Sequence, residues 1–277
     1  METASVILAA GRGSRMKGYT GNKTLLPLKP GKTAYEGTYP IIFNILSNLP
    51  PGPRVVIVNH AKEDVIAATK DLGVTIREQP ELNGTGGALL AAAPFLETVT
   101  CDTLIITMGD VPLVTHKTYN ELASALKDHA LVVLGFKPGL RKQYGLLEIE
   151  GDRVRKIIEW TYWSAYPEER KQALRICNSG IYAVQIGILL RYIPVLASRP
   201  HVVHKEVDGR FKSVSEYFIT DLVEYMYEDG LSTGYTIAAD EEEVMGVDDP
   251  AALKRAQEIY MSGIEDTGQL FKIRDRT

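Results

Sequence analysis

The sequence predicts an α/β fold in which a mixed, mostly parallel sheet is flanked by helices and completed by a smaller second lobe. Short apolar segments alternate with amphipathic segments through the first half of the chain. This is the pattern of a parallel sheet covered by helices on both faces. After Gly145 the apolar segments are separated by longer polar connections, and this change indicates the second lobe.

The alternating segments are expected to form strands and helices in turn. Strands are predicted over residues 6–10, 55–58, 103–108, 131–136, 146–149, 154–158 and 181–184. Helices are predicted over residues 41–49, 63–72, 85–96 and 119–127, with another after residue 250. No linker rich in Pro, Gly or Ser separates the halves. We therefore expect one domain over residues 1–255, with halves 1–115 and 116–255, and a helical tail over 256–277.

The composition is that of an ordinary globular protein. Of the 277 residues, 45% are hydrophobic and 24% are charged, which is enough to bury a core. The sequence has no apolar stretch near the roughly 18 residues that span a bilayer, and no basic leader at its start. Its two cysteines, Cys101 and Cys177, imply no disulfide framework. We expect a cytoplasmic protein without a membrane partner, and the net charge of −4 argues against nucleic acid as a partner.

Positive charge is concentrated near the amino end. No acidic residue lies between Thr3 and Tyr35. Six basic residues fall in the same stretch, namely Arg12, Arg15, Lys17, Lys23, Lys29 and Lys32. This distribution suits a site for a local anion, and it equally suits a basic strip on the surface.

A glycine-rich turn, Gly11–Gly18, directly follows the first predicted strand. Backbone N–H groups in such a turn can face a phosphate. The dinucleotide-binding fingerprint would need a third glycine where Met16 stands, and the P-loop would need lysine where Tyr19 stands. Both of these motifs therefore fail. Arg15 offers a planar fork for triphosphate oxygens, and Lys23 adds a point charge farther along.

The segment LAAGRGSRM, followed by Lys23 and Leu25–Leu28, resembles the signature of the sugar-1-phosphate nucleotidyltransferases. The resemblance is strongest to the uridylyltransferase (pyrophosphorylase) domain of bacterial N-acetylglucosamine-1-phosphate uridylyltransferases. Further matching motifs follow in order: QPELNGTGG, GDVPL, the elements YG, NSG and YFITD, and GVDDP. The resemblance covers roughly residues 5–255 and implies a Rossmann-like nucleotide-diphospho-sugar transferase fold. It also implies that the first half binds nucleotide and the second half binds sugar.

The same resemblance implies a role for each matching residue. The catalytic residues would be Arg15 and Lys23; the nucleotide-binding residues Leu8, Ala10, Gly11, Gly13, Gln79, Gly84 and Thr85; the sugar-binding residues Gly145, Glu159, Asn178 and Thr220; and the metal ligands Asp110 and Asp248. This sequence departs from the family at Asn22, where proline is usual, at Leu82, where a second glutamine is common, and at Trp160. The aromatic segment 160–166 could stack on a sugar or pack the lobe.

The expected cofactor is Mg²⁺. Asp110 follows a predicted buried strand, and a carboxylate at a strand's carboxyl end is well placed for Mg²⁺ beside phosphates. By resemblance Asp248 supplies the second oxygen ligand. The remaining ligands would be waters and phosphate oxygens.

The expected reaction is transfer of a nucleotidyl group, preferably uridylyl from UTP, to a sugar 1-phosphate with release of pyrophosphate. The nucleophile is an ionised phosphate oxygen, so the reaction needs no general base. A cytidylyl- or thymidylyltransferase, a non-catalytic nucleotide-sugar-binding subunit and a dinucleotide-dependent oxidoreductase are the alternatives. No hexapeptide repeat follows residue 250 in this sequence, so we expect it to lack the β-helix acetyltransferase domain.

Several polar residues are expected to have no role in the site. His201 and His204 have a spacing that suits metal only on a helix, and Pro200 argues against a helix there. The acidic run 240–243 is expected to be a solvated turn. The two cysteines lack the spacing of a zinc site.

Overall fold

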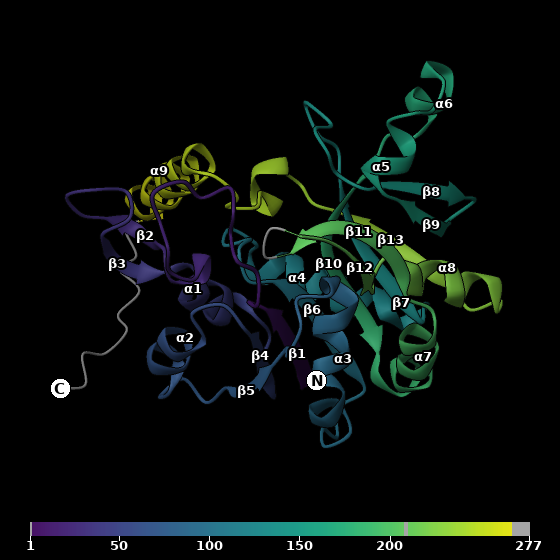
Figure 1. Ribbon diagram of the computed structural model, residues 1–277, viewed down its shortest axis with the longest axis horizontal. Helices are drawn as coiled ribbons and strands as arrows, with labels where there is room; N and C mark the ends of the chain where they lie inside the picture. Colours follow the sequence, from purple (N-terminus) through teal and green to yellow (C-terminus); the bar gives the residue numbers. More distant parts are fainter. Residues whose placement is uncertain (1, 208–209, 268–277) are drawn as a thin grey trace.

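The computed structural model describes residues 2–207 and 210–267, and at its centre is a mixed sheet with the strand order β13-β7-β10-β6-β1-β4-β5 (Figure 1). These strands are β1 (Thr3–Leu8), β4 (Arg54–Val58), β5 (Thr75–Glu78), β6 (Thr103–Met108), β7 (Leu131–Phe136), β10 (Cys177–Gln185) and β13 (Thr233–Ile237). Strands β5, β4, β1 and β6 are mutually parallel, as are β7 and β13, and β10 runs antiparallel between β6 and β7. The predicted mixed, mostly parallel sheet is confirmed.

Smaller sheets and hairpins surround this centre. They are β2 (Pro27–Pro30) with β3 (Gly37–Pro40), β8 (Leu146–Glu150) with β9 (Arg153–Ile158), and β11 (His201–Val207) with β12 (Arg210–Glu216). The β8–β9 hairpin joins the main sheet through β10. In Figure 1 this hairpin and the helices α5 (Trp160–Trp163) and α6 (Glu168–Ala173) project together from one end of the molecule.

Helices cover both faces of the main sheet because successive residues of its strands point to opposite sides. In β1, Ile7 packs in one core while Val6 packs in the other. The first core is covered by α1 (Ile41–Asn48), α2 (Lys62–Thr69), α4 (His116–Ser124) and α9 (Pro250–Thr267). The second is covered by α3 (Gly84–Leu96), α7 (Ile186–Ser198) and α8 (Asp221–Glu228). Strands buried on both sides read as continuous apolar runs.

Several predicted boundaries shift in the structure. The strand predicted over 6–10 is β1, which ends at Leu8, so that Ala9 and Ala10 begin the glycine-rich loop. The helix predicted over 119–127 begins at His116 because the Thr115 hydroxyl caps it, accepting from the Thr118 N–H at 3.2 Å. It ends in the 3-10 turn η2 (Ala125–Lys127).

The carboxyl-terminal helix packs into the body of the molecule. The expected division at residue 255 falls inside α9, whose Gln257 is buried and donates hydrogen bonds of 2.8 Å to the carbonyls of Pro27 and Ala34. Figure 1 shows α9 beside β2 and β3, which come from the other end of the sequence. Residues 268–277 of the expected tail lie outside the described part.

None of the helices among the described residues is both long and apolar enough to cross a membrane.

Candidate functional site

A cleft of about 940 Å³ opens at the carboxyl ends of β1, β4 and β6. After β1 the chain adds β4 and β5 on one side and then returns to place β6 on the other. Such a reversal leaves a crevice in which ligands of open α/β sheets bind. The expected catalytic, nucleotide-binding and metal residues all line this cleft: Leu8, Ala10, Gly11, Gly13, Arg15, Lys23, Gln79, Gly84, Thr85, Asp110 and Asp248.

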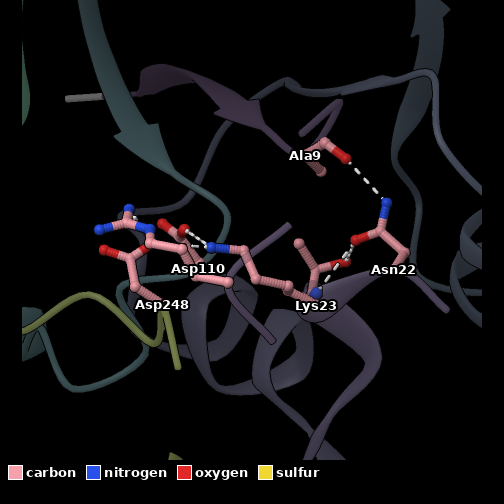
Figure 2. A network of polar contacts seen from close by, with 7 residues as sticks. Ala9, Asn22, Lys23, Asp110 and Asp248 are labelled. Atoms are coloured by element: carbon pink, nitrogen blue, oxygen red, sulfur yellow. Dashed lines mark hydrogen bonds and ion pairs between the residues drawn. The ribbon is translucent and has the colours of Figure 1, made fainter. Parts of the chain in front are cut away.

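Lys23 lies between the two expected metal ligands. Its Nζ is 2.5 Å from Asp110 Oδ2 and 2.9 Å from Asp248 Oδ1 (Figure 2). The Nη2 of Arg15 lies 2.9 Å from the same Asp248 oxygen. Asp110 lies two residues after the end of β6, while Asp248 lies in the segment between the 3-10 turn η3 (Glu241–Val244) and α9. The fold therefore gathers two anions and two cations from distant parts of the chain.

The Lys23 ammonium is held as a cation. Burial alone would lower its pKa, but the charges of Asp110 and Asp248 and their hydrogen bonds outweigh burial, so the pKa is raised. The Arg15 side chain remains 68% exposed, compared with 11% for that of Lys23. Arg15 is thus available to a ligand entering the cleft, and Lys23 forms part of its floor.

The glycine-rich loop packs directly on the Lys23 side chain. Gly13 has a φ of +61°, and a Cβ at this position would lie 2.5 Å from Lys23 Cγ. Any larger residue would therefore displace the lysine stem. Met16, which stands where a dinucleotide fingerprint needs glycine, is buried in the core below the loop.

The loop before α3 is cross-linked by amide side chains. Gln79 is buried, and its Nε2 donates to Asn83 Oδ1 at 2.9 Å and to the Gly84 carbonyl at 3.0 Å. Asn59, just after β4, donates from Nδ2 to the Gln79 carbonyl at 2.7 Å. Asn59 and Asn83 also line the cleft, and neither is among the predicted site residues. For Asn59 a signal existed, because it follows a predicted strand at the ligand-binding edge.

Backbone contacts join this loop to the segment that follows β12. The Gly86 N–H donates to the Tyr217 carbonyl at 2.8 Å, the Tyr217 N–H to the Asn83 carbonyl at 2.9 Å, and the Ile219 N–H to the Thr85 hydroxyl at 3.2 Å. Gly84 has a φ of +92°, and a Cβ there would collide with the Tyr217 carbonyl. Close packing against the Tyr217 backbone therefore requires glycine at Gly84 and Gly86, apart from any contact with a ligand.

The four residues expected to bind sugar lie together, beside the cleft rather than in its lining. Asn178 donates its N–H to the Gly145 carbonyl at 2.8 Å, and the Thr220 hydroxyl bonds to the Glu159 carboxylate. Burial raises the pKa of Glu159, and the bond from Thr220 offsets part of the rise. Met108, which lines the cleft, packs close to Gly180 next to this group.

The aromatic segment contributes to packing in part. The Trp163 side chain is buried, and its Nε1 donates to the Tyr144 carbonyl at 2.8 Å, while the Arg170 guanidinium lies over the Tyr166 ring at 3.8 Å. Trp160 and Tyr162 remain exposed, at 38% and 59%.

The acidic run 240–243 is a largely solvent-accessible turn, as expected, but its glutamates also contact other segments. Glu241 accepts from the Gly139 N–H, Glu242 pairs with Arg255, and Glu243 accepts from both the N–H of Thr115 and the hydroxyl of Thr118 at the start of α4. These contacts secure the segment that leads to Asp248. The local sequence pattern does not predict these contacts, because each partner lies more than ten residues away in the sequence.

The histidines His201 and His204 and the two cysteines lie outside the lining of the cleft. His201 lies on a strand, β11, and its Nε2 pairs with Asp221 Oδ2 at 2.8 Å in a structural contact. His204 is exposed. Cys101 and Cys177 are both free thiols.

Known structures share this architecture. The chain superposes on a putative glucose-1-phosphate thymidylyltransferase from Bacillus anthracis with a TM-score of 0.66 and 21% identity, over 93% of this chain and 95% of that one. It superposes on a putative UDP-N-acetylglucosamine pyrophosphorylase from Entamoeba histolytica with a TM-score of 0.65 and 14% identity, over 86% and 73%. These likenesses confirm the Rossmann-like nucleotide-diphospho-sugar transferase fold.

Sequence comparison identifies the family. The bifunctional protein GlmU of Jannaschia sp. is 34% identical over 265 residues, which cover 94% of this chain and 52% of the relative. The chain thus spans about half the length of the curated relatives it matches. The family model of the MobA-like NTP transferase domain matches residues 5–178, more than half of the chain. The chain therefore belongs to the family of MobA-like NTP transferase domains, and it is a nucleotidyltransferase.

Proposed function

We propose that this chain transfers a nucleotidyl group from a nucleoside triphosphate to a sugar 1-phosphate, with UTP as the preferred donor and Mg²⁺ as cofactor. The observation that carries the proposal is the convergence of Arg15, Lys23, Asp110 and Asp248 in one cleft at the carboxyl edge of the sheet. A basic loop beside a pair of carboxylates suits a triphosphate with a divalent ion. GlmU, the thymidylyltransferase and the pyrophosphorylase named above support a sugar-phosphate acceptor.

The residues present fit a Mg²⁺ ion. Asp110 and Asp248 both contact one ammonium nitrogen, which stands in for a cation shared between them. Among the described residues no group of three or more His, Cys, Asp and Glu side chains gathers at one point. Two carboxylates with phosphate oxygens and waters make the all-oxygen ligand set that Mg²⁺ prefers. When bound, Mg²⁺ neutralises phosphate charge and orients the triphosphate.

The reaction is an in-line displacement. A phosphate oxygen of the sugar 1-phosphate forms a bond to the α-phosphorus, the bond from that phosphorus to the α–β bridging oxygen breaks, and pyrophosphate leaves with the electron pair. The exposed Arg15 guanidinium binds phosphate oxygens of the donor, and the Lys23 ammonium neutralises charge near the transferred group. The nucleophile is already ionised, so no side chain has to remove a proton.

The second lobe positions the acceptor. Glu159, Asn178 and Thr220 offer carboxylate, amide and hydroxyl groups, which can each pair with sugar hydroxyl or amide groups. Gln79, Gly84 and Thr85 line the cleft and bind the base. The hydrogen bonds between residues Asn83–Gly86 and residues Tyr217–Ile219 connect this base-binding loop to the segment that carries Thr220.

A pyrophosphate-release screen tests the proposal. The four nucleoside triphosphates are each combined with Mg²⁺ and with N-acetylglucosamine 1-phosphate or glucose 1-phosphate. We expect release only when both substrates are present, and most with UTP. Asp110→Asn should lower turnover by about 10²-fold or more, because a partly buried negative ligand is lost. Asp248→Asn should be tolerated better, since the Asp248 side chain is 38% exposed, compared with 21% for that of Asp110. Release without a sugar phosphate, or no release with any pair, would contradict the proposal.

A further inference from the structure

The Asn22 side chain is buried and uses its whole hydrogen-bonding capacity. It is 1% exposed. Its Nδ2 donates to the carbonyls of Ala9 and His60, both at 2.9 Å. Its Oδ1 accepts from the N–H and the hydroxyl of Thr24, at 3.0 Å and 2.8 Å. A primary amide has two N–H donors and two acceptor sites, so none is left over.

The partners of Asn22 lie in three separate segments: Ala9 and Thr24 line the cleft, and His60 is next to Asn59, which also lines it. Ala9 follows β1 and begins the glycine-rich loop, and His60 follows the neighbouring parallel strand β4. Thr24 lies in the 3-10 turn η1 (Lys23–Leu25), whose first residue is Lys23. In Figure 2 the Asn22 side chain points to Ala9, while the Lys23 side chain extends the other way, toward Asp110 and Asp248.

Capping of η1 does not explain why this residue is an asparagine. The cap uses only Oδ1, and aspartate caps helix starts as well as asparagine does. The two bonds from Nδ2 reach carbonyls 13 and 38 residues away in sequence. Only the N–H₂ group of an amide can make them, and they are what connect η1 to the ends of β1 and β4.

We propose that Asn22 is a positioning residue for nucleotidyl transfer, which fixes the Lys23 ammonium relative to the glycine-rich loop. This inference rests on the proposed function. Lys23 is the next residue in the chain, and its stem already packs against Gly13 of that loop. The two hydrogen bonds from Asn22 Nδ2 fix the distance between the backbone next to Lys23 and the backbone at the start of the glycine-rich loop. Transfer depends on that separation because a misplacement of about 1 Å can cost about 10²-fold in rate.

Two variants remove the cross-links by different routes. Asn22→Asp keeps the shape and the cap but loses both donors. Asn22→Pro removes all four bonds, and the backbone at this position, φ −77° and ψ 128°, is one that proline adopts. Gln257→Glu is the matched control, because Gln257 is also a buried amide that donates to two backbone carbonyls, but in α9. All three variants are compared at a temperature where each is folded.

The test combines kinetics, calorimetry of Mg²⁺–UTP binding and a double-mutant cycle with Lys23→Met. We expect Asn22→Asp and Asn22→Pro to lower kcat by on the order of 10-fold to 10²-fold, and Gln257→Glu to lose stability with kcat unchanged. In the Lys23→Met background Asn22→Asp should have little further effect on kcat or on UTP affinity, because it acts through Lys23. Additive losses, or a kcat for the Asn22 variants that matches the Gln257→Glu control, would overturn the inference.

Failure of this inference differs from failure of the proposed function. If the wild-type chain turns over and the Asn22 variants match it, only the positioning role is lost. If the wild-type chain releases no pyrophosphate, the proposed function fails. The calorimetric cycle then tests only whether Asn22 acts through Lys23: losses of nucleotide affinity that do not add support this coupling, and losses that add refute it.

Discussion

The Lys23 ammonium contacts two carboxylates of the cleft, those of Asp110 and Asp248. It balances these carboxylates, which would repel each other without it, and it does so in a largely buried place. Asp110 and Asp248 would hold a divalent ion bound together with the triphosphate, and the Lys23 ammonium would then be free to contact phosphate. The residue is therefore expected to act twice, first as a counter-ion and then as a group that stabilises the transition state.

Lys23→Ala should lower kcat/KM by about 10²-fold or more, since it removes charge stabilisation of the transition state. The fold should survive, because Arg15 still pairs with Asp248 and both carboxylates keep contact with solvent. Steady-state kinetics and a melting curve check both statements. Near-normal turnover in the variant would remove Lys23 from the mechanism.

Lys23 should also compete with divalent ions in the nucleotide-free protein. We expect Mn²⁺ to bind the nucleotide-free wild-type chain weakly and to bind Lys23→Met more tightly, because the ammonium no longer occupies the space between Asp110 and Asp248. The electron paramagnetic resonance signal of free Mn²⁺ measures this without any turnover. Equal Mn²⁺ affinity in the two proteins would show that the ammonium does not compete.

Glu159 gives a pH dependence with a defined sign. Burial raises its pKa above the ordinary 4.5, so the folded state favours the protonated form. Its contribution to stability is fully present below the ordinary value and is lost as pH rises through the raised value. Glu159→Gln should therefore be more stable than the wild-type chain near neutral pH and equally stable at low pH. Urea unfolding at several pH values tests this, and a variant less stable at neutral pH would reverse the sign.

At the scale of elements, the start of α3 is fitted to the backbone of Tyr217. Gly84→Ala should destabilise the protein and weaken UTP binding, because its left-handed backbone costs about 1–2 kcal/mol for a non-glycine residue and the new Cβ meets the Tyr217 carbonyl. Gly73→Ala is the control, since Gly73 has a φ of +65° with open space around it. Equal losses in urea unfolding and unchanged UTP affinity in both variants would contradict this role.

The sequence predicts elements well where their signal is local. The strands at 103–108 and 131–136 match β6 and β7, because each is a continuous apolar run buried on both sides. The place of β10, antiparallel between β6 and β7, is set by pairing across long stretches of chain, and no local pattern encodes it. The same holds for the cleft. Motifs identified Lys23 and Asp110, whereas the bonds of Asn22 to Ala9 and His60 exist only once the chain is folded.

At the scale of the whole molecule, the cleft depends on both halves of the chain. The glycine-rich loop and Asp110 come from the first half, and Asp248 is delivered by the segment between β13 and α9. The segment after β12 contacts the loop before α3, which lines the cleft. Substrates bound across such a cleft are aligned by a rigid frame, which is how transfer between two phosphates gains most of its rate.

The central claim is that a sugar 1-phosphate attacks the α-phosphorus of the donor. The most direct measurement uses sugar 1-phosphate whose non-bridging phosphate oxygens are ¹⁸O, with UTP and Mg²⁺, and follows the products by mass spectrometry. Attack at the α-phosphorus predicts that the label stays entirely in the nucleotide-sugar and that the pyrophosphate carries none. Labelled pyrophosphate, or unlabelled UMP as the only nucleotide product, would contradict the account.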